Sequence, residues 1–234
     1  MAIPMYTRHC DAPPSCHHCP FPPASCPLPA RFLPASCPLP ARFLPASYPT
    51  LAMTTTQNSP LVPPPIALLS TGGTFEKIYH PLTGTLAFTE SGIAAWKTQC
   101  QMPENTRLEV AFLVDSLDMT DAQRSALCAR IRDCPENQVV IIHGTDTLVT
   151  SAKEALKTKR PEQVVVFTGA MVPASCAASD ALFNLGMAMA TVQCQPPGVW
   201  VACSGRVFAA DAVEKDRAQG RFVARTPNAE SKAP

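Results

Sequence analysis

Short apolar runs alternate with helix-like patterns from residue 66 to about residue 204. The runs are rich in Val, Ile and Leu and are typical of buried strands, at 66–73, 108–114, 138–144, 164–170 and 198–204. Helical spacing lies between them, at 121–133, 148–158 and 180–192. Thr120 and Gln123 have the spacing of a capping box at the start of the first helix. The helix at 180–192 is apolar nearly all round, which predicts that it is buried.

Strands that are almost continuously apolar and alternate with helices indicate a parallel sheet that is covered on both faces. The sequence therefore predicts an α/β fold with a doubly wound, mostly parallel sheet and helices on both faces. No internal boundary interrupts residues 61–225, which we expect to form one domain. The polar segment 226–234 is expected to be a flexible tail.

The N-terminal segment has a different composition. It holds 17 of the 26 prolines within residues 1–65, together with five of the 11 cysteines. The sequence PASCPLPARFL at 23–33 recurs at 34–44. Proline fixes φ and lacks a backbone donor, so this repeat predicts a disordered segment over residues 1–60. Met53, which precedes the change to ordinary composition, is the expected natural start.

Composition excludes several classes of partner. The net charge of +1 gives no basic surface for nucleic acid, and no apolar run approaches the ~18 residues of a membrane span. The other six cysteines mostly lie in apolar runs and indicate reduced core residues of a cytoplasmic protein. No cluster of His, Cys or Asp with ligand spacing follows residue 61, so we expect neither a metal nor an organic cofactor.

Polar residues gather where the predicted strands end. In a doubly wound sheet, ligands bind outside the carboxyl ends of the strands. The segments at this edge are TGGT at 71–74, DSLD at 115–118, HGTDT at 143–147, TGA at 168–170 and DAVEKD at 211–216. Small residues, hydroxyls and carboxylates dominate them, with one nearby lysine.

Three chemistries compete for this edge. The glycine pair could bind a phosphate, but TGGTFEKIY matches neither common nucleotide-binding motif. A serine hydrolase would require a G-x-S-x-G pattern, which is absent here. A threonine nucleophile fits better, since glycines beside it let backbone N–H groups approach a developing oxyanion.

The motifs STGGTF, HGTDTL, TGAMVPASCAASDALFNL and GRVFAADAVEKD resemble, in order and spacing, the N-terminal domain of the L-asparaginase family. The resemblance covers residues 64–222. The chain ends near the point where long members continue into a smaller domain, which favours a short, single-domain, cytoplasmic-type member. The resemblance implies a homo-oligomer that hydrolyses a small amide.

The resemblance also assigns residues to the reaction. Thr74 matches the primary nucleophile, Thr145 the second essential threonine, and Lys215 the lysine that completes a group with Asp146. The resemblance leaves open whether Lys215 abstracts a proton or positions and relays one, since a neighbouring carboxylate favours a charged lysine. Tyr79 is the only tyrosine after TGGT that could activate Thr74.

Other positions are expected to bind the substrate. Ser116 matches the serine that holds the α-carboxylate and amine region, and Leu117 stands where long members often have glutamine. Gly73 and Gly144 supply backbone N–H groups beside the two threonines. The expected reaction is hydrolysis of the side-chain amide of L-asparagine, or a related small amide, to the acid and ammonia. The alternatives are a non-catalytic amino-acid binding or regulatory module and a nucleotide-binding protein.

Several polar residues have simpler interpretations. Thr147 is expected to cap the following helix, and Asp146 taken alone would accept backbone N–H bonds in the same turn. Thr71 is expected to serve packing at the strand end, and His143 is expected to be a hydrogen-bonded structural histidine rather than a base. Asp180 and Asn184 are expected to sit at a helix N-terminus and to tie a loop to the core, respectively.

Overall fold

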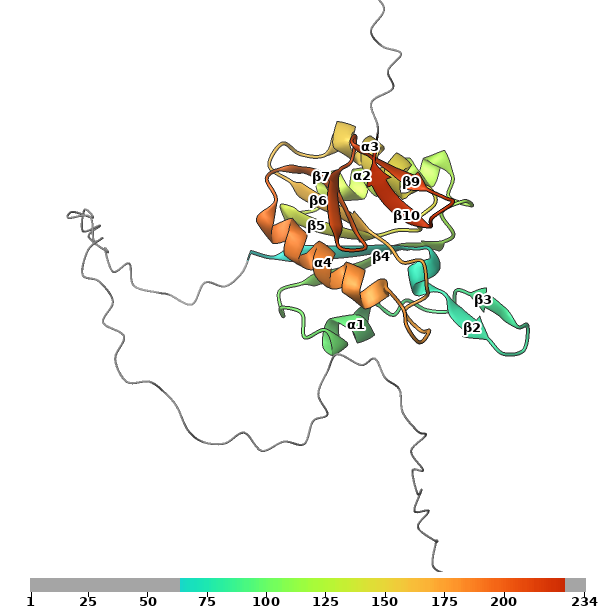
Figure 1. The fold of residues 1–234 in the computed structure, drawn as a ribbon. Helices are drawn as coiled ribbons and strands as arrows, with labels where there is room; N and C mark the ends of the chain where they lie inside the picture. Colours follow the sequence, from blue (N-terminus) through green and yellow to red (C-terminus); the bar gives the residue numbers. More distant parts are fainter. Residues whose placement is uncertain (1–63, 226–234) are drawn as a thin grey trace, which may run out of the picture. The chain divides into compact units, whose positions relative to one another are not determined.

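The computed structural model describes residues 64–225 (Figure 1). A six-stranded sheet has the order β4-β1-β5-β6-β7-β8. Its strands are β1 (Ile66–Gly72), β4 (Arg107–Val114), β5 (Gln138–Ile142), β6 (Val164–Thr168), β7 (Gly198–Cys203) and β8 (Arg206–Ala209). All neighbours pair in parallel except β7 and β8. The predicted mostly parallel sheet is confirmed, while the predicted segments 1–60 and 226–234 lie outside the described residues.

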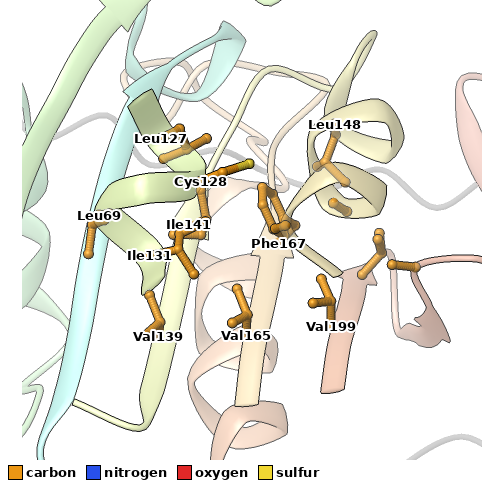
Figure 2. Close-up of a cluster of buried hydrophobic side chains, with 14 of the residues drawn as sticks. Leu69, Leu127, Cys128, Ile131, Val139, Ile141, Leu148, Val165, Phe167 and Val199 are labelled. Carbon is orange, nitrogen blue, oxygen red and sulfur yellow. The ribbon is translucent and has the colours of Figure 1, made fainter. Parts of the chain in front are cut away.

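Helices cover both faces of this sheet, as predicted. Helices α2 (Asp121–Asp133) and α3 (Leu148–Thr158) pack in one apolar cluster with inward side chains of β1, β5, β6 and β7 (Figure 2). Helices α1 (Ile93–Gln99) and α4 (Ala181–Cys194) contribute to a second cluster on the opposite face. The capping box of Thr120 and Gln123 at the start of α2 is confirmed.

Two hairpins lie outside the main sheet. The turn η1 (Thr74–Glu76) and the hairpin of β2 (Ile78–His80) and β3 (Thr85–Ala87) follow β1 directly. A second hairpin, β9 (Val213–Asp216) with β10 (Arg221–Ala224), follows β8. No helix within residues 64–225 is both long and apolar enough to cross a membrane.

The connection from β5 to β6 through α3 and the connection from β6 to β7 through α4 have opposite handedness. Strands β5, β6 and β7 advance across the sheet in one direction, yet α3 and α4 pack on opposite faces. One crossover is therefore left-handed, against the strong right-handed preference of parallel sheets. With α4 on the far face, the face shared by α3 and β7 accommodates the β9–β10 hairpin, whose Val213 and Phe222 join the α2–α3 cluster.

Two expectations about burial are corrected. Helix α4 buries one side only, since Phe183 remains 63% exposed although its sequence is apolar all round. Helix α4 is covered on one side only, where it packs against the sheet, so the apolar residues on its outer side stay at the surface. Of the six described cysteines, all free, three are buried (Cys128, Cys134 and Cys203), whereas Cys100 and Cys194 are exposed and Cys176 is half-buried.

The ends of β1 and β5 touch through their backbones. The chain leaves β1 toward β4 on one side and returns to β5 on the other, so these two neighbours flank the point where the strand order reverses. A Cβ atom added to Gly73 would lie 2.3 Å from Gly144 Cα, and one added to Gly144 would lie 2.6 Å from Ser116 Oγ. Only glycine permits this approach, which brings three strand-end loops together.

A chain of hydrogen bonds runs beneath the same edge. Arg124 of α2 donates to Ser151 Oγ of α3, which lies 2.8 Å from His143 Nε2. His143 Nδ1 lies 2.9 Å from the Gly144 carbonyl oxygen. Since Arg124 can only donate, the consistent assignment is that Ser151 donates to Nε2 and Nδ1–H donates to the carbonyl. His143 is therefore a neutral, hydrogen-bonded structural residue, as expected.

We predict that Gly73→Ala destabilises the fold far more than Gly84→Ala. Both glycines have positive φ, 68° and 67°, but an added Cβ at Gly84 meets nothing within 4 Å. Backbone strain alone costs about 1–2 kcal/mol, and overpacking against Gly144 adds about 1–3 kcal/mol more. Urea unfolding of the two variants measures the difference, and equal losses would contradict the close approach.

We predict that protonation of His143 destabilises the fold in acid. Burial, helped by the charge of Arg124 and opposed by the hydrogen bond to Gly144, lowers the pKa of His143 to about 4 from 6.5. The unfolded state takes up the proton first, so stability is lost as pH falls from 6.5 toward 4, by about 3 kcal/mol in all. Urea unfolding across this range should show a flatter pH profile for His143→Gln, whereas His80→Gln should keep the wild-type slope. Identical slopes in the two variants would contradict the assignment.

Candidate active site

Lys215 contacts both Thr145 and Asp146, the two residues that follow Gly144. Its Nζ donates to Thr145 Oγ1 at 2.8 Å and to Asp146 Oδ1 at 2.9 Å. The Lys215 side chain is 13% exposed and that of Asp146 is 33% exposed, while Thr145 is buried. The lysine arrives from β9, about 70 residues along the chain, so the fold brings together three residues that the sequence grouped.

Thr74 lies directly after the glycine contact. It begins the η1 turn, is half-buried, and its hydroxyl makes no hydrogen bond within residues 64–225. Because Gly73 packs on Gly144, the segments that carry Thr74 and Thr145 run side by side at the reversal point of the sheet. The hydroxyl of Thr74 is thus free, whereas that of Thr145 is held by Lys215.

Ser116 lies in the same group of loops and has a buried hydroxyl without a partner. Ser116 is 2% exposed, and its Oγ forms no hydrogen bond among the described residues. A buried hydroxyl left unpaired costs about 1–3 kcal/mol, so the Ser116 hydroxyl is suited to bind a polar group from outside the chain.

Thr147 holds the Ser116 loop rather than capping its own helix. It occupies the N-cap position of α3, but its side chain makes no bond to the helix backbone. Instead its Oγ1 donates to the Ser116 carbonyl oxygen at 2.8 Å. The expected cap is therefore wrong, because the carbonyl of the neighbouring loop competes successfully for this hydroxyl. Asp146 likewise pairs with Lys215 instead of serving the turn.

Sequence reasoning missed an ion pair beside Ser116. Lys77 Nζ lies 2.5 Å from Asp115 Oδ2, and Asp115 Oδ1 accepts from the Leu117 N–H at 3.0 Å. Burial acts to raise the pKa of Asp115, but the Lys77 and Leu117 hydrogen bonds and the charges of Lys77 and Lys215 hold it below its usual value. The partners are 38 residues apart, and only the pairing of β1 with β4 brings them together.

Tyr79 and Leu117 lie at the surface of this region. Tyr79 is 60% exposed on β2, and within residues 64–225 it forms no hydrogen bond to Thr74. Leu117 is 64% exposed in the turn after β4. The roles of both side chains toward a substrate stay predictions.

The remaining polar residues serve the scaffold. Thr71 donates to the Ile142 carbonyl oxygen between β1 and β5. Asp180 is the N-cap residue of α4, yet it accepts from the N–H groups of Met171 and Val172 in the preceding loop. Asn184 bonds the carbonyl of Gly169 and the N–H of Ser204, which confirms its predicted role between loop and core.

Among residues 64–225, no group of three or more His, Cys, Asp or Glu side chains could hold a metal ion. The geometry that is present suits covalent acyl chemistry. It offers a free hydroxyl on Thr74, a second hydroxyl that accepts from a lysine which is itself paired with a carboxylate, and a buried unpaired hydroxyl on Ser116.

Part of this chain is similar in sequence to known proteins. The chain is 36% identical to an L-asparaginase of Thermococcus kodakarensis over 83 residues, 35% of this chain and 25% of the relative. It is 30% identical to an L-asparaginase of Bacillus licheniformis over 160 residues, 64% and 49% of the two chains. The chain thus spans at most about half the length of these curated relatives.

A solved structure shows the same fold. The probable cytoplasmic L-asparaginase of Campylobacter jejuni matches with a TM-score of 0.57 and 29% identity, over 65% of this chain and 49% of that one. The model of the family described as "Asparaginase, N-terminal" matches residues 65–233, well over half of the chain. The chain therefore belongs to the asparaginase family.

Proposed function

We propose that this chain hydrolyses the side-chain amide of L-asparagine to L-aspartate and ammonia through a threonine nucleophile. The observation that carries the proposal is Lys215, whose Nζ bridges Thr145 Oγ1 and Asp146 Oδ1 next to the loop of Thr74. Family membership supports an amidohydrolase, and the two named L-asparaginases support asparagine as the substrate.

In the first step, Thr74 Oγ1 attacks the carbonyl carbon of the amide. A C–O bond forms, the carbonyl oxygen becomes an oxyanion, and the hydroxyl proton leaves Thr74. The Gly73 N–H, expected to serve the substrate, instead donates to the Val114 carbonyl oxygen. The other backbone N–H groups of the glycine loops, with that of Thr145, are the proposed donors to the oxyanion. Collapse breaks the C–N bond, the nitrogen takes up the proton that Thr74 released and leaves as ammonia, and an ester to Thr74 remains.

In the second step, water completes the hydrolysis. The Thr145–Lys215–Asp146 group positions the water, whose oxygen forms a bond to the ester carbon. The same group relays a proton from the water to Thr74 Oγ1, while the C–O bond to Thr74 breaks and aspartate leaves. A positioning and relay role for Lys215 follows from its contacts, since it already donates to two oxygens. Tyr79, as the predicted activating hydroxyl, must change conformation to reach Thr74, because it makes no hydrogen bond to that residue here.

Substrate recognition rests on Ser116 in this proposal. Its unpaired buried hydroxyl gains a partner when the α-carboxylate of the amino acid arrives. The nearby Lys77–Asp115 pair offers charges of both signs to the α-amino and α-carboxylate groups. Leu117, which is exposed next to Ser116, supplies apolar surface in this proposal.

The cellular setting is also a proposal. All six described cysteines are free, which supports a reducing compartment such as the cytoplasm. The exposed Phe183 and Val207 of neighbouring α4 and β8 support self-association into a homo-oligomer.

The alternative function, amino-acid binding without turnover, differs from the main proposal in a single measurement, the release of ammonia.

We predict that Thr74→Val and Thr145→Val each lower the rate of ammonia release from L-asparagine by about 10³-fold or more, since each removes one acting hydroxyl. The full chain serves for these assays. Thr71→Val is the matched control, because the Thr71 hydroxyl bonds only the Ile142 carbonyl. It should lose about 1 kcal/mol of stability and keep its turnover. Equal rates in all three variants and the wild type would end the proposal.

We predict that Ser116→Ala raises KM for L-asparagine about tenfold without loss of stability, because the Ser116 hydroxyl has no hydrogen bond to lose within the described residues. Thr106 has the only other described side-chain hydroxyl that is buried and unpaired. Thr106→Val should therefore also preserve or raise the free energy of unfolding, but leave KM unchanged. A rise in KM for both variants, or for neither, would remove Ser116 from the binding site.

A further inference from the structure

A cavity in the described part of the chain lies between helices α2 and α3. Its volume is about 450 Å³, within the range of about 300–1,000 Å³ typical of small-molecule sites. None of the proposed catalytic or substrate-binding residues lines it. The walls carry Asp121, Arg124, Ser125, Cys128, Ala129, Arg132, Thr150, Glu154 and Thr158.

Arg124 is the residue that makes this cavity unusual. It is 8% exposed, and no carboxylate among the described residues forms an ion pair with it. One of its N–H groups donates to Ser151 Oγ, and the others have no protein partner within residues 64–225. These free N–H groups are not fully buried, and Arg124 lines the cavity, so the guanidinium is suited to receive an anion there. A planar fork of donors matches a carboxylate in particular.

The acidic residues on the wall restrict what that anion can be. Asp121 has no hydrogen-bond or ion-pair partner in this part of the structure, whereas Glu154 pairs with Lys157. Two carboxylates repel a ligand that carries only negative charge, and they favour one that also carries an ammonium group. Thr150, Ser125 and Thr158 add neutral hydroxyls to the wall.

We propose that the α2–α3 cavity is a second binding site, which takes an α-amino acid with its carboxylate on Arg124 and its ammonium group on Asp121. None of the strand-end residues of the candidate active site lines this cavity, and the proposal does not rest on the proposed reaction.

The site has a direct connection to the strand ends. Arg124 is the first member of the hydrogen-bond chain through Ser151 and His143 to the carbonyl of Gly144, the residue before Thr145. A ligand on Arg124 competes for the guanidinium that orients Ser151. Occupancy of the cavity is therefore expected to alter the Gly144–Thr145 turn and, with it, turnover.

Calorimetric titration of the full chain with L-alanine tests the proposal. L-Alanine carries both charged groups and no side-chain amide. We expect saturable binding in the wild type and in Ser116→Ala, and at least a tenfold weaker dissociation constant in Arg124→Gln. Ser125→Tyr, which fills the cavity from an exposed position, should abolish binding. Asp121→Asn should weaken L-alanine about tenfold but not acetate, which has no ammonium group.

Controls separate the outcomes. Arg130→Gln lies on the same helix but outside the cavity, so it should bind like the wild type. Ser125→Tyr and Asp121→Asn change exposed residues and keep the test valid if Arg124→Gln fails to fold. Absence of binding, equal binding of acetate and L-alanine, or loss of binding only in Ser116→Ala would overturn the proposal. Ammonia release is measured separately in each variant, so failure here leaves the proposed reaction untouched.

Discussion

The backbone contact between Gly73 and Gly144 is the constraint on which the candidate site depends. It involves no side chain, and a single added carbon atom at either residue would fall inside a neighbouring atom. The contact fixes how near the loops after β1 and β5 can lie, and therefore how near Thr74 can come to Thr145. Gly144 also packs on Ser116, so the loop after β4 shares the same constraint. Three loops thus take their spacing from two glycines.

The topology explains why these loops meet at all. Since β1 lies between β4 and β5, the three strand ends that carry the site are immediate neighbours. The loops diverge to opposite faces from this point, which leaves room for small polar side chains between them. Hydrogen bonds then lock the arrangement, including Thr147 on the Ser116 carbonyl and Gly73 N–H on Val114. The site is held mainly by backbone contacts, which tolerate few substitutions.

Local patterns in the sequence were sufficient for the elements and for most of the polar edge. The strands at 66–72 and 138–142 and the helix at 121–133 follow from apolar spacing and from one capping box. Long-range competition decided the errors. Thr147 bonds a loop 31 residues away instead of its helix, and Asp115 pairs with Lys77 across two strands. The exposed side of α4 escaped prediction because apolar composition does not reveal how many layers cover a helix.

The position of Lys215 shows how an apolar contact can support a polar one. Lys215 lies opposite Phe222 in the β9–β10 hairpin, so the two side chains project from the same face of this small sheet. Phe222 is 2% exposed and packs in the α2–α3 cluster with Val213. A two-stranded hairpin is marginal by itself, so its buried aromatic ring is what holds it on the main sheet. The hydrophobic anchor therefore fixes the backbone from which Lys215 reaches Thr145 and Asp146. The placement of α3 and α4 on opposite faces of the sheet therefore has a functional consequence, because it frees the surface on which the hairpin's apolar side chains pack.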